Sequence, residues 1–121
     1  MLDVKNLSIS DRTGRTLVRN VSFELHAGEV LAVAGVQGNG QTELAEAIFG
    51  QYPIDSGEVI VEGESIRLNS SPAALKAGIG YVPPDRLTQG LFLEQSILRN
   101  LVAVGIDQYQ SRGKRLSKKR L

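Results

Sequence analysis

Apolar and polar residues alternate along two early segments of the chain. Residues 2–9 alternate with one shift of phase, and residues 17–25 end in three apolar residues at every second position. This pattern is typical of strands with one buried face, and a turn signal at residues 11–14 separates the two. Residues 30–34 are apolar throughout, which favours a strand buried on both faces. The first third of the chain is therefore predicted to be built of strands.

Helical spacing replaces the alternation after a glycine-rich break. The apolar residues of segment 44–48 fall on one side of a helix, and Gly50 is placed to end that helix. Further along, two short apolar runs predict strands and two segments predict helices. The strands are expected at residues 59–61 and 79–82, with a hairpin turn at residues 62–64, and the helices near residues 71–77 and 95–104. The mixture predicts an α/β fold.

The segment from Gly35 to Thr42 joins the predicted buried strand to the first helix. Such a loop directs backbone N–H groups and the positive end of the helix to one place, which suits a phosphate. Its glycines permit backbone conformations closed to other residues and let the phosphate approach closely. The segment matches the P-loop spacing at every defined position but one. We predict that the loop binds a nucleotide through Gly35, Gln37, Gly38, Asn39, Gly40, Gln41, Thr42 and Glu43.

Gln41 is the exception, because it stands where a P-loop has lysine. A charge pair at ~4 Å and an effective dielectric of ~20 is worth about 4 kcal/mol before desolvation is subtracted. Glutamine can donate a hydrogen bond but carries no charge, and Glu43 adds a negative charge nearby. Thr42 stands where a hydroxyl would hold Mg²⁺. The sequence thus predicts nucleotide binding with impaired γ-phosphate chemistry; a tight turn without a ligand is the alternative interpretation.

Composition narrows the class of protein. The 121 residues have a formal net charge of +1, 41% of them are apolar, and there is no cysteine. The near-neutral charge argues for no nucleic-acid partner, and disulfides are excluded. Every apolar run is shorter than the ~18 residues that a membrane span needs, and the N-terminus lacks the layout of a signal peptide. We expect a soluble, intracellular globular protein.

Three segments together resemble the start of the ATPase domain of ABC transporters. Residues 20–30 resemble the stretch that leads into the P-loop strand of that family, and the loop follows at the family's distance. Residues 80–86 resemble a variant of its Q-loop region. The resemblance implies a P-loop NTPase-like half-domain, with an antiparallel β subdomain and part of a parallel core sheet. Residues 1–104 are then a partial nucleotide-binding domain, and residues 105–121 a basic C-terminal segment that starts the helical region.

The loop without lysine, followed by Thr42-Glu43-Leu44 and by V-P-x-D-R, resembles one subgroup more closely. This is the second, degenerate ABC domain of bacterial importers for sugars and nucleosides. The resemblance implies ATP and Mg²⁺ as cofactors, permease subunits and another ABC domain as partners, and a peripheral location at the cytoplasmic face of the membrane. It also implies that residues 87–100 lie near the permease contact; a core position for the apolar residues 91–93 is the alternative.

The departures from the family leave three functions open. Pro84 stands at the Q-loop position, where the family has Gln or Glu, and Asp85 is a candidate substitute for it. The chain is expected to hold a degenerate ATP site with little or no hydrolysis on its own. The alternatives are an ATPase that becomes competent when assembled, and a structural interaction module with a vestigial loop.

Overall fold

The computed structural model describes residues 1–67 and 70–106, and the chain divides into two units, Met1–Tyr81 and Val82–Leu121. The first unit contains β1 (Leu2–Ser10), β2 (Thr16–Leu25), α1 (Gln41–Ile48), β3 (Ser56–Val61), β4 (Glu64–Ser65) and α2 (Ser71–Lys76). The second contains one π-helical turn, η1 (Arg86–Gly90), and α3 (Ile97–Val102). The expected division at residue 104 stays a prediction, because residues 107–121 lie outside the described part of the chain.

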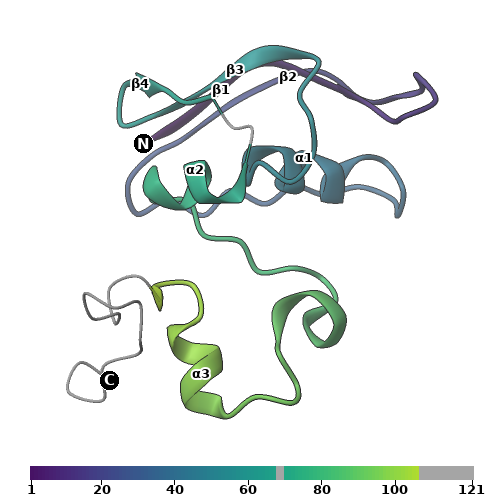
Figure 1. The fold of residues 1–121 in the computed structure, drawn as a ribbon. Helices are drawn as coiled ribbons and strands as arrows, with labels where there is room; N and C mark the ends of the chain where they lie inside the picture. The colour runs from purple at the N-terminus through teal and green to yellow at the C-terminus, as the bar shows by residue number, and fades with distance from the viewer. Residues whose placement is uncertain (68–69, 107–121) are drawn as a thin grey trace. The chain divides into compact units, whose positions relative to one another are not determined.

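The strands of the first unit form one antiparallel sheet in the order β2-β1-β3-β4. Helices α1 and α2 lie against the same face of this sheet (Figure 1). The predicted strands at residues 2–9, 17–25 and 59–61 are confirmed, as are the hairpin after β3 and the helix that follows the glycine-rich loop. This layer of helices on a sheet confirms the α/β fold and the antiparallel β subdomain.

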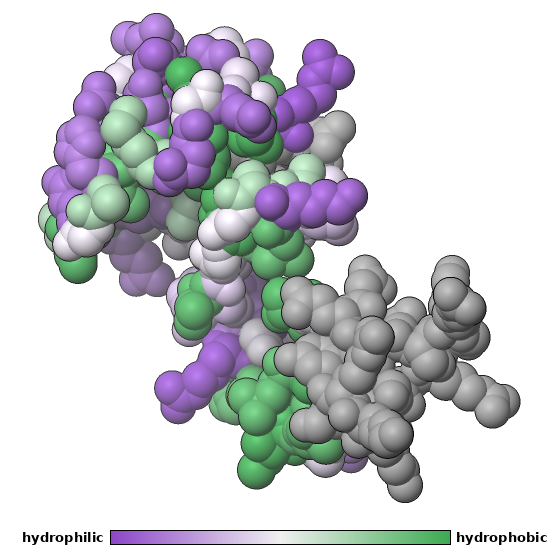
Figure 2. Space-filling model, turned by 90° about the vertical axis from the view of Figure 1, so that its left-hand side faces the viewer, coloured by the Kyte–Doolittle hydropathy of each residue, from purple (hydrophilic) through white to green (hydrophobic). Residues whose placement is uncertain are grey.

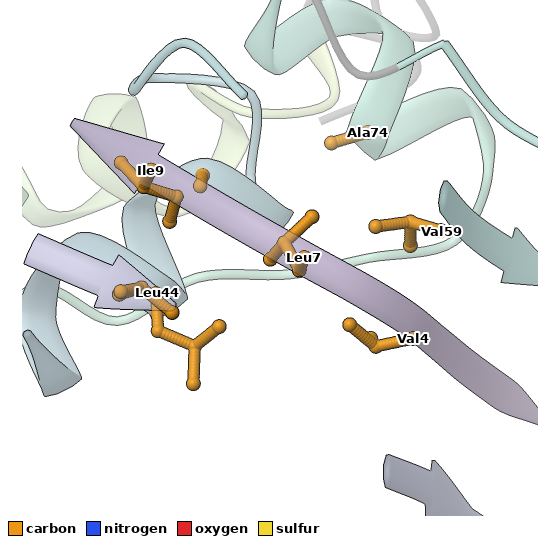
Figure 3. Close-up of a cluster of buried hydrophobic side chains, with 8 residues drawn as sticks. Val4, Leu7, Ile9, Leu44, Val59 and Ala74 are labelled. Carbon is orange, nitrogen blue, oxygen red and sulfur yellow. The ribbon is translucent and has the colours of Figure 1, made fainter. Parts of the chain in front are cut away.

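The core lies between the sheet and the two helices, with β1 at its centre. Side chains from β1, β3, α1 and α2 meet there, as Figure 3 shows for six of them. Val4, Leu7 and Ile9 on β1 are completely buried. The other buried apolar residues of this cluster are Val18, Leu44, Ala47, Val59 and Ala74. The helices therefore cover the apolar face that the alternation along β1 and β2 predicts.

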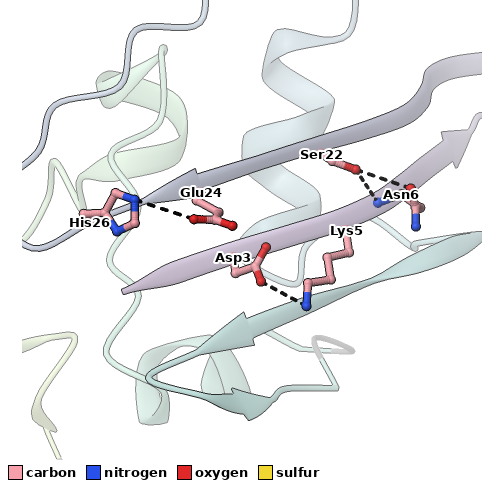
Figure 4. A network of polar contacts seen from close by, with 6 residues as sticks. All are labelled: Asp3, Lys5, Asn6, Ser22, Glu24 and His26. Atoms are coloured by element: carbon pink, nitrogen blue, oxygen red, sulfur yellow. Dashed lines mark hydrogen bonds and ion pairs between the residues drawn. The ribbon is translucent and has the colours of Figure 1, made fainter.

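Each of the paired strands β1 and β2 contains a β-bulge, and the bulge in β1 explains the shift of phase along that strand. Lys5 and Asn6 together oppose Ser22 of β2, which returns the next apolar residue of β1 to the core face. Asn6 has a φ of 50°, and its backbone N–H donates to Ser22 Oγ at 2.8 Å (Figure 4). A matching bulge in β2 has Asn20 at the same φ, with its N–H donating to Ser8 Oγ at 3.0 Å. Each extra residue is thus held by a serine of the facing strand.

Ion pairs near the N-terminal end of β1 contribute little to this arrangement. Lys5 Nζ lies 3.1 Å from Asp3 Oδ2, and His26 Nε2 lies 3.6 Å from Glu24 Oε2 (Figure 4). His26 also donates its backbone N–H to Glu29 Oε2 at 2.8 Å, so it helps to close the turn after β2. Asp3 is 8% exposed, but Lys5, His26 and Glu24 are about half exposed, and pairs that reach solvent in this way are worth at most about 1 kcal/mol. The fold is stabilised mainly by the apolar core.

Residues 30–34 and 79–82 are expected to form strands, and the structure corrects these two element predictions. Residues 30–34 and 79–82 are not in strands, and the described residues form no parallel sheet. Val30 is 94% exposed and Val82 is 87% exposed. A strand buried on both faces needs neighbouring strands for its N–H and C=O groups, and no described segment pairs with either run. The apolar pattern therefore identified segments suited to a parallel sheet, but the predicted part of the parallel core sheet is not formed.

The second unit is built around α3. Ser96 Oγ accepts a hydrogen bond from the N–H of Arg99 at 3.3 Å, which caps the helix, and the helix predicted near residues 95–104 is confirmed. Hydrophobic side chains, green in Figure 2, gather at the surface of this unit. The exposed ones among the described residues are Val82, Leu87, Leu91, Phe92, Leu93, Ile97, Leu98, Leu101, Val104 and Ile106. Among the described helices, none is long and apolar enough to cross a membrane.

Candidate functional site

Two glycines shape the loop that precedes α1. Gly38 and Gly40 have φ angles of 86° and 92°, which residues with a side chain rarely adopt. Between them the N–H of Asn39 donates to the carbonyl oxygen of Val36 at 3.2 Å, so the loop turns back on itself. Helix α1 then begins at Gln41, directly after Gly40. The predicted succession of glycine-rich loop and helix is therefore confirmed.

The N-terminal amides of α1 have no protein acceptor. In the described part of the chain, no hydrogen bond is donated by the backbone N–H of Gln41, Thr42 or Glu43, and no side chain caps the helix. The first amide with an acceptor is that of Leu44, which donates to Gly40 at 2.8 Å. Unpaired amides at the positive end of a helix attract an anion. These three amides are therefore free to donate to a ligand.

The Gln41 side chain folds back onto the loop. Its Nε2 donates to the carbonyl oxygen of Val36 at 3.2 Å. A Cβ placed on Gly35 would lie 2.0 Å from the same Nε2, so the carboxamide occupies the space beside Gly35 that its missing side chain leaves open. Gln41 therefore bonds to the loop and brings no charge to it. Thr42 is exposed and Glu43 half-buried in the first turn of α1, which leaves the Thr42 hydroxyl accessible.

A pocket of about 270 Å³ lies beside the loop on the β2 side. Its lining joins β2, the extended segment before the loop, and the start of α1. The lining residues are Leu17, Val18, Arg19, Val21, Val33, Ala34, Gly35, Asn39, Gly40, Gln41 and Leu44. Four predicted site residues are among them. Arg19 was not predicted, and the period-two pattern of β2 gives no sign that this residue borders the loop. A larger pocket, of about 730 Å³, shares no residue with the loop.

Asp85 in the second unit is engaged in local hydrogen bonds. Its Oδ1 accepts from the N–H groups of Leu87 and Thr88 at 3.1 and 3.2 Å, and its Oδ2 accepts from Thr88 Oγ1 at 2.6 Å. The Thr88 hydroxyl is the main reason that the pKa of Asp85 lies below its usual value. Asp85 thus caps η1, and the described residues include no cluster of side chains that could by itself hold a metal ion.

Replacing Thr88 by valine should raise the pKa of Asp85, because valine keeps the shape but removes the hydroxyl donor. In the wild type the lowered pKa means that the cap stabilises η1 above pH 3.8 and is lost as the pH falls through the lowered value. The pKa is measured from the carboxyl ¹³C shift of Asp85 during an acid titration. Asp11, whose pKa is lowered mainly by Thr13, is the internal control and should not change. An unchanged Asp85 titration would contradict the assigned cause.

Comparison with known proteins shows which family the chain resembles. The ABC transporter family model matches residues 18–120. The chain is 37% identical to the ribose import ATP-binding protein RbsA of Clostridium tetani, over 99% of this chain and 23% of the relative. It is 40% identical to the protein of the same name from Geobacillus kaustophilus, over 90% of this chain and 22% of the relative. It is 39% identical to a putative ribose/galactose/methyl galactoside import ATP-binding protein of Halalkalibacterium halodurans, over 88% of this chain and 20% of the relative.

The share of the chain that these matches cover shows which family it belongs to. The chain spans about a fifth of the length of these curated relatives. The family model, by contrast, covers most of the chain, including the glycine-rich loop and α1. This chain belongs to the ABC transporter family, and its fold is that of a P-loop NTPase.

Proposed function

We propose that the chain forms the nucleotide-binding part of the ATPase subunit of an importer for a sugar or a nucleoside. Membership of the ABC transporter family supports binding of ATP. The relatives are named as import ATP-binding proteins for ribose or for ribose, galactose and methyl galactoside, which supports sugar uptake. Nucleosides remain within the proposal because they contain ribose.

The unpaired amides at the start of α1 are the observation that carries this proposal. They receive the phosphate tail, with the positive φ angles of Gly38 and Gly40 giving the loop its turn and Gly35 making room for the Gln41 carboxamide. The whole proposed set is Gly35, Gln37, Gly38, Asn39, Gly40, Gln41, Thr42 and Glu43. Mg²⁺ fits the same place, because the Thr42 hydroxyl and the phosphates of the nucleotide are the oxygen ligands that this ion prefers.

The site is degenerate in this proposal, with little or no hydrolysis by this chain alone. Gln41 gives its carboxamide to the loop and contributes no charge to the γ-phosphate. Pro84 cannot ligate Mg²⁺ through its side chain, and the carboxylate of Asp85 is engaged in capping η1. Binding of ATP then has a structural or regulatory role in the transporter.

The second unit supplies the contact with the permease in this proposal. Leu91, Phe92 and Leu93 are 44%, 65% and 64% exposed, which weakens the alternative that they are core residues. Together with Ile97 and Leu101 they line an apolar pocket of about 340 Å³. Exposed apolar surface of this kind marks protein interaction sites. The proposed partners are permease subunits and another ABC domain, and the proposed location is the cytoplasmic face of the membrane.

Titration of Mg-ATP into the wild-type chain and into Gln41→Lys tests the nucleotide site. The wild type should bind ATP, and the variant should bind about ten times more tightly, because a lysine adds a full charge beside the phosphates. Titration calorimetry gives the affinities. Gln51→Lys is the matched control, since it adds the same charge at an exposed position just beyond the C-terminal end of α1 and should leave the affinity unchanged.

Two results would contradict the proposal. The absence of ATP binding at millimolar concentration, with the thermal melt of the chain intact, would indicate a vestigial loop. Equal gains in Gln41→Lys and Gln51→Lys would show that net charge, rather than the loop, governs the affinity.

A further inference from the structure

Arg19 is the one ionisable residue in the lining of the 270 Å³ pocket beside the loop. β2 contributes this arginine together with Leu17, Val18 and Val21. The rest of the lining comes from the segment before the loop, from the loop itself and from the start of α1. Because Gln41 is neutral, Arg19 is the only cation that the lining offers to a nucleotide held on the loop.

The bulge in β2 places this arginine at the edge of the pocket. Val18 and Val21 are three residues apart, so in a regular strand their side chains would point to opposite faces of the sheet. Both nevertheless pair with core residues of β1, because Arg19 and Asn20 together oppose Ser8. The hydrogen bond from the Asn20 N–H to Ser8 Oγ fixes this extra residue. Bulges next to binding sites redirect side chains in this way.

Among residues 1–67 and 70–106, no carboxylate competes for Arg19. The side chain is exposed, and in the described part of the chain no carboxylate lies within ion-pair distance of its guanidinium. A guanidinium presents five N–H donors in a planar array that matches two phosphate oxygens at once. An unpaired arginine beside amides that attract anions is therefore suited to a phosphate ligand.

We propose that Arg19 is a positioning residue that binds phosphate oxygens of the nucleotide on the loop, and so provides the positive charge that Gln41 does not. The amides at the start of α1 and the guanidinium from β2 then hold the same phosphate tail. This inference rests on the proposed nucleotide site. The positive charge of the site then comes from β2, a strand that is not part of the loop motif.

Replacing Arg19 by glutamine tests the role of its charge. The affinity for ATP should fall about tenfold, whereas the affinity for adenosine, which has no phosphate, should stay unchanged. Arg19→Lys should restore most of the ATP affinity, and the wild-type affinity should depend more steeply on salt than that of Arg19→Gln. Amide chemical shifts in nucleotide titrations give both affinities. Arg15→Gln, an exposed arginine of the same hairpin outside the pocket lining, is the matched control and should bind ATP like the wild type.

The outcomes separate this inference from the proposed function. Equal losses of ATP and adenosine affinity would overturn it, because they indicate a contact with the base or a structural role. Unchanged ATP affinity in Arg19→Gln, with ATP binding by the wild type, would overturn the role of Arg19 alone. A folded wild type that binds no ATP would overturn the nucleotide site and this inference together.

Discussion

Replacing Gly40 by alanine should abolish nucleotide binding and destabilise the first unit by about 3 kcal/mol or more. The residue has a φ of 92°, where a side chain costs roughly 1–2 kcal/mol. An added Cβ would also lie 2.5 Å from the carbonyl oxygen of Leu17 and 3.0 Å from Val18 Cγ2. Because the first of these atoms is backbone, either the loop or β2 must move. Chemical denaturation measures the loss of stability, and ATP titration measures the loss of binding.

Gly28→Ala separates the cost of a side chain at positive φ from the clash of the added Cβ with β2. Gly28 has a φ of 77°, but an added Cβ would meet no atom within 4 Å. This control should lose only the conformational part, roughly 1–2 kcal/mol, and should still bind ATP. Equal effects of the two substitutions would show that the close approach of the loop to β2 is not what makes Gly40 necessary.

Local chemistry made the first helix predictable. Gly50 was expected to end it, and the structure has this glycine at a φ of 76° just beyond α1. Its N–H donates to Ala47, and the N–H of Gln51 donates to Glu46, which together satisfy two carbonyl groups at the helix end. A sequence specifies such features well because they depend on neighbouring residues only.

The shift of phase along β1 could be seen in the sequence, but its cause could not. The interrupted alternation implied an irregular strand, yet the bulge is held by the Ser22 hydroxyl of β2, a residue far along the chain. The position of Arg19 has the same origin, since the pairing of β2 with β1 sets it. The pattern of a single segment cannot predict features that depend on the register between two strands.

The two missing strands show that an apolar pattern alone does not determine whether a strand forms. Complete apolarity at residues 30–34 indicates a preference for burial on both faces, but it does not supply the strands that would pair with this segment. Asp85 shows the same limit on a smaller scale, because the family resemblance suggested it as a substitute at the Q-loop position, whereas Thr88 and Leu87 engage it in a cap. Residue type defines what a position can do, and its neighbours decide which role it takes.

Replacing Leu7 by alanine should cost about 2–5 kcal/mol of stability, the range for a buried leucine. Leu7 is completely buried at the centre of β1 and belongs to the core cluster that includes Leu44 of α1 (Figure 3). Small domains are stable by only about 5–15 kcal/mol, so this loss removes much of the total. A cavity at this place also weakens the support of α1, whose first turn carries the unpaired amides. ATP affinity should therefore fall with stability in denaturation and titration experiments.

Leu75→Ala provides the comparison for Leu7. Leu75 lies on α2 of the same unit and is 37% exposed, so the same truncation should cost less than at Leu7, about 1–2 kcal/mol, and leave ATP binding intact. Similar losses for both leucines would mean that β1 is not the centre of the core. A large loss of stability in Leu7→Ala with unchanged ATP affinity of the folded fraction would show that the loop keeps its geometry without the packing beneath α1. The geometry of the phosphate loop would then depend on its glycines and its contact with β2 alone.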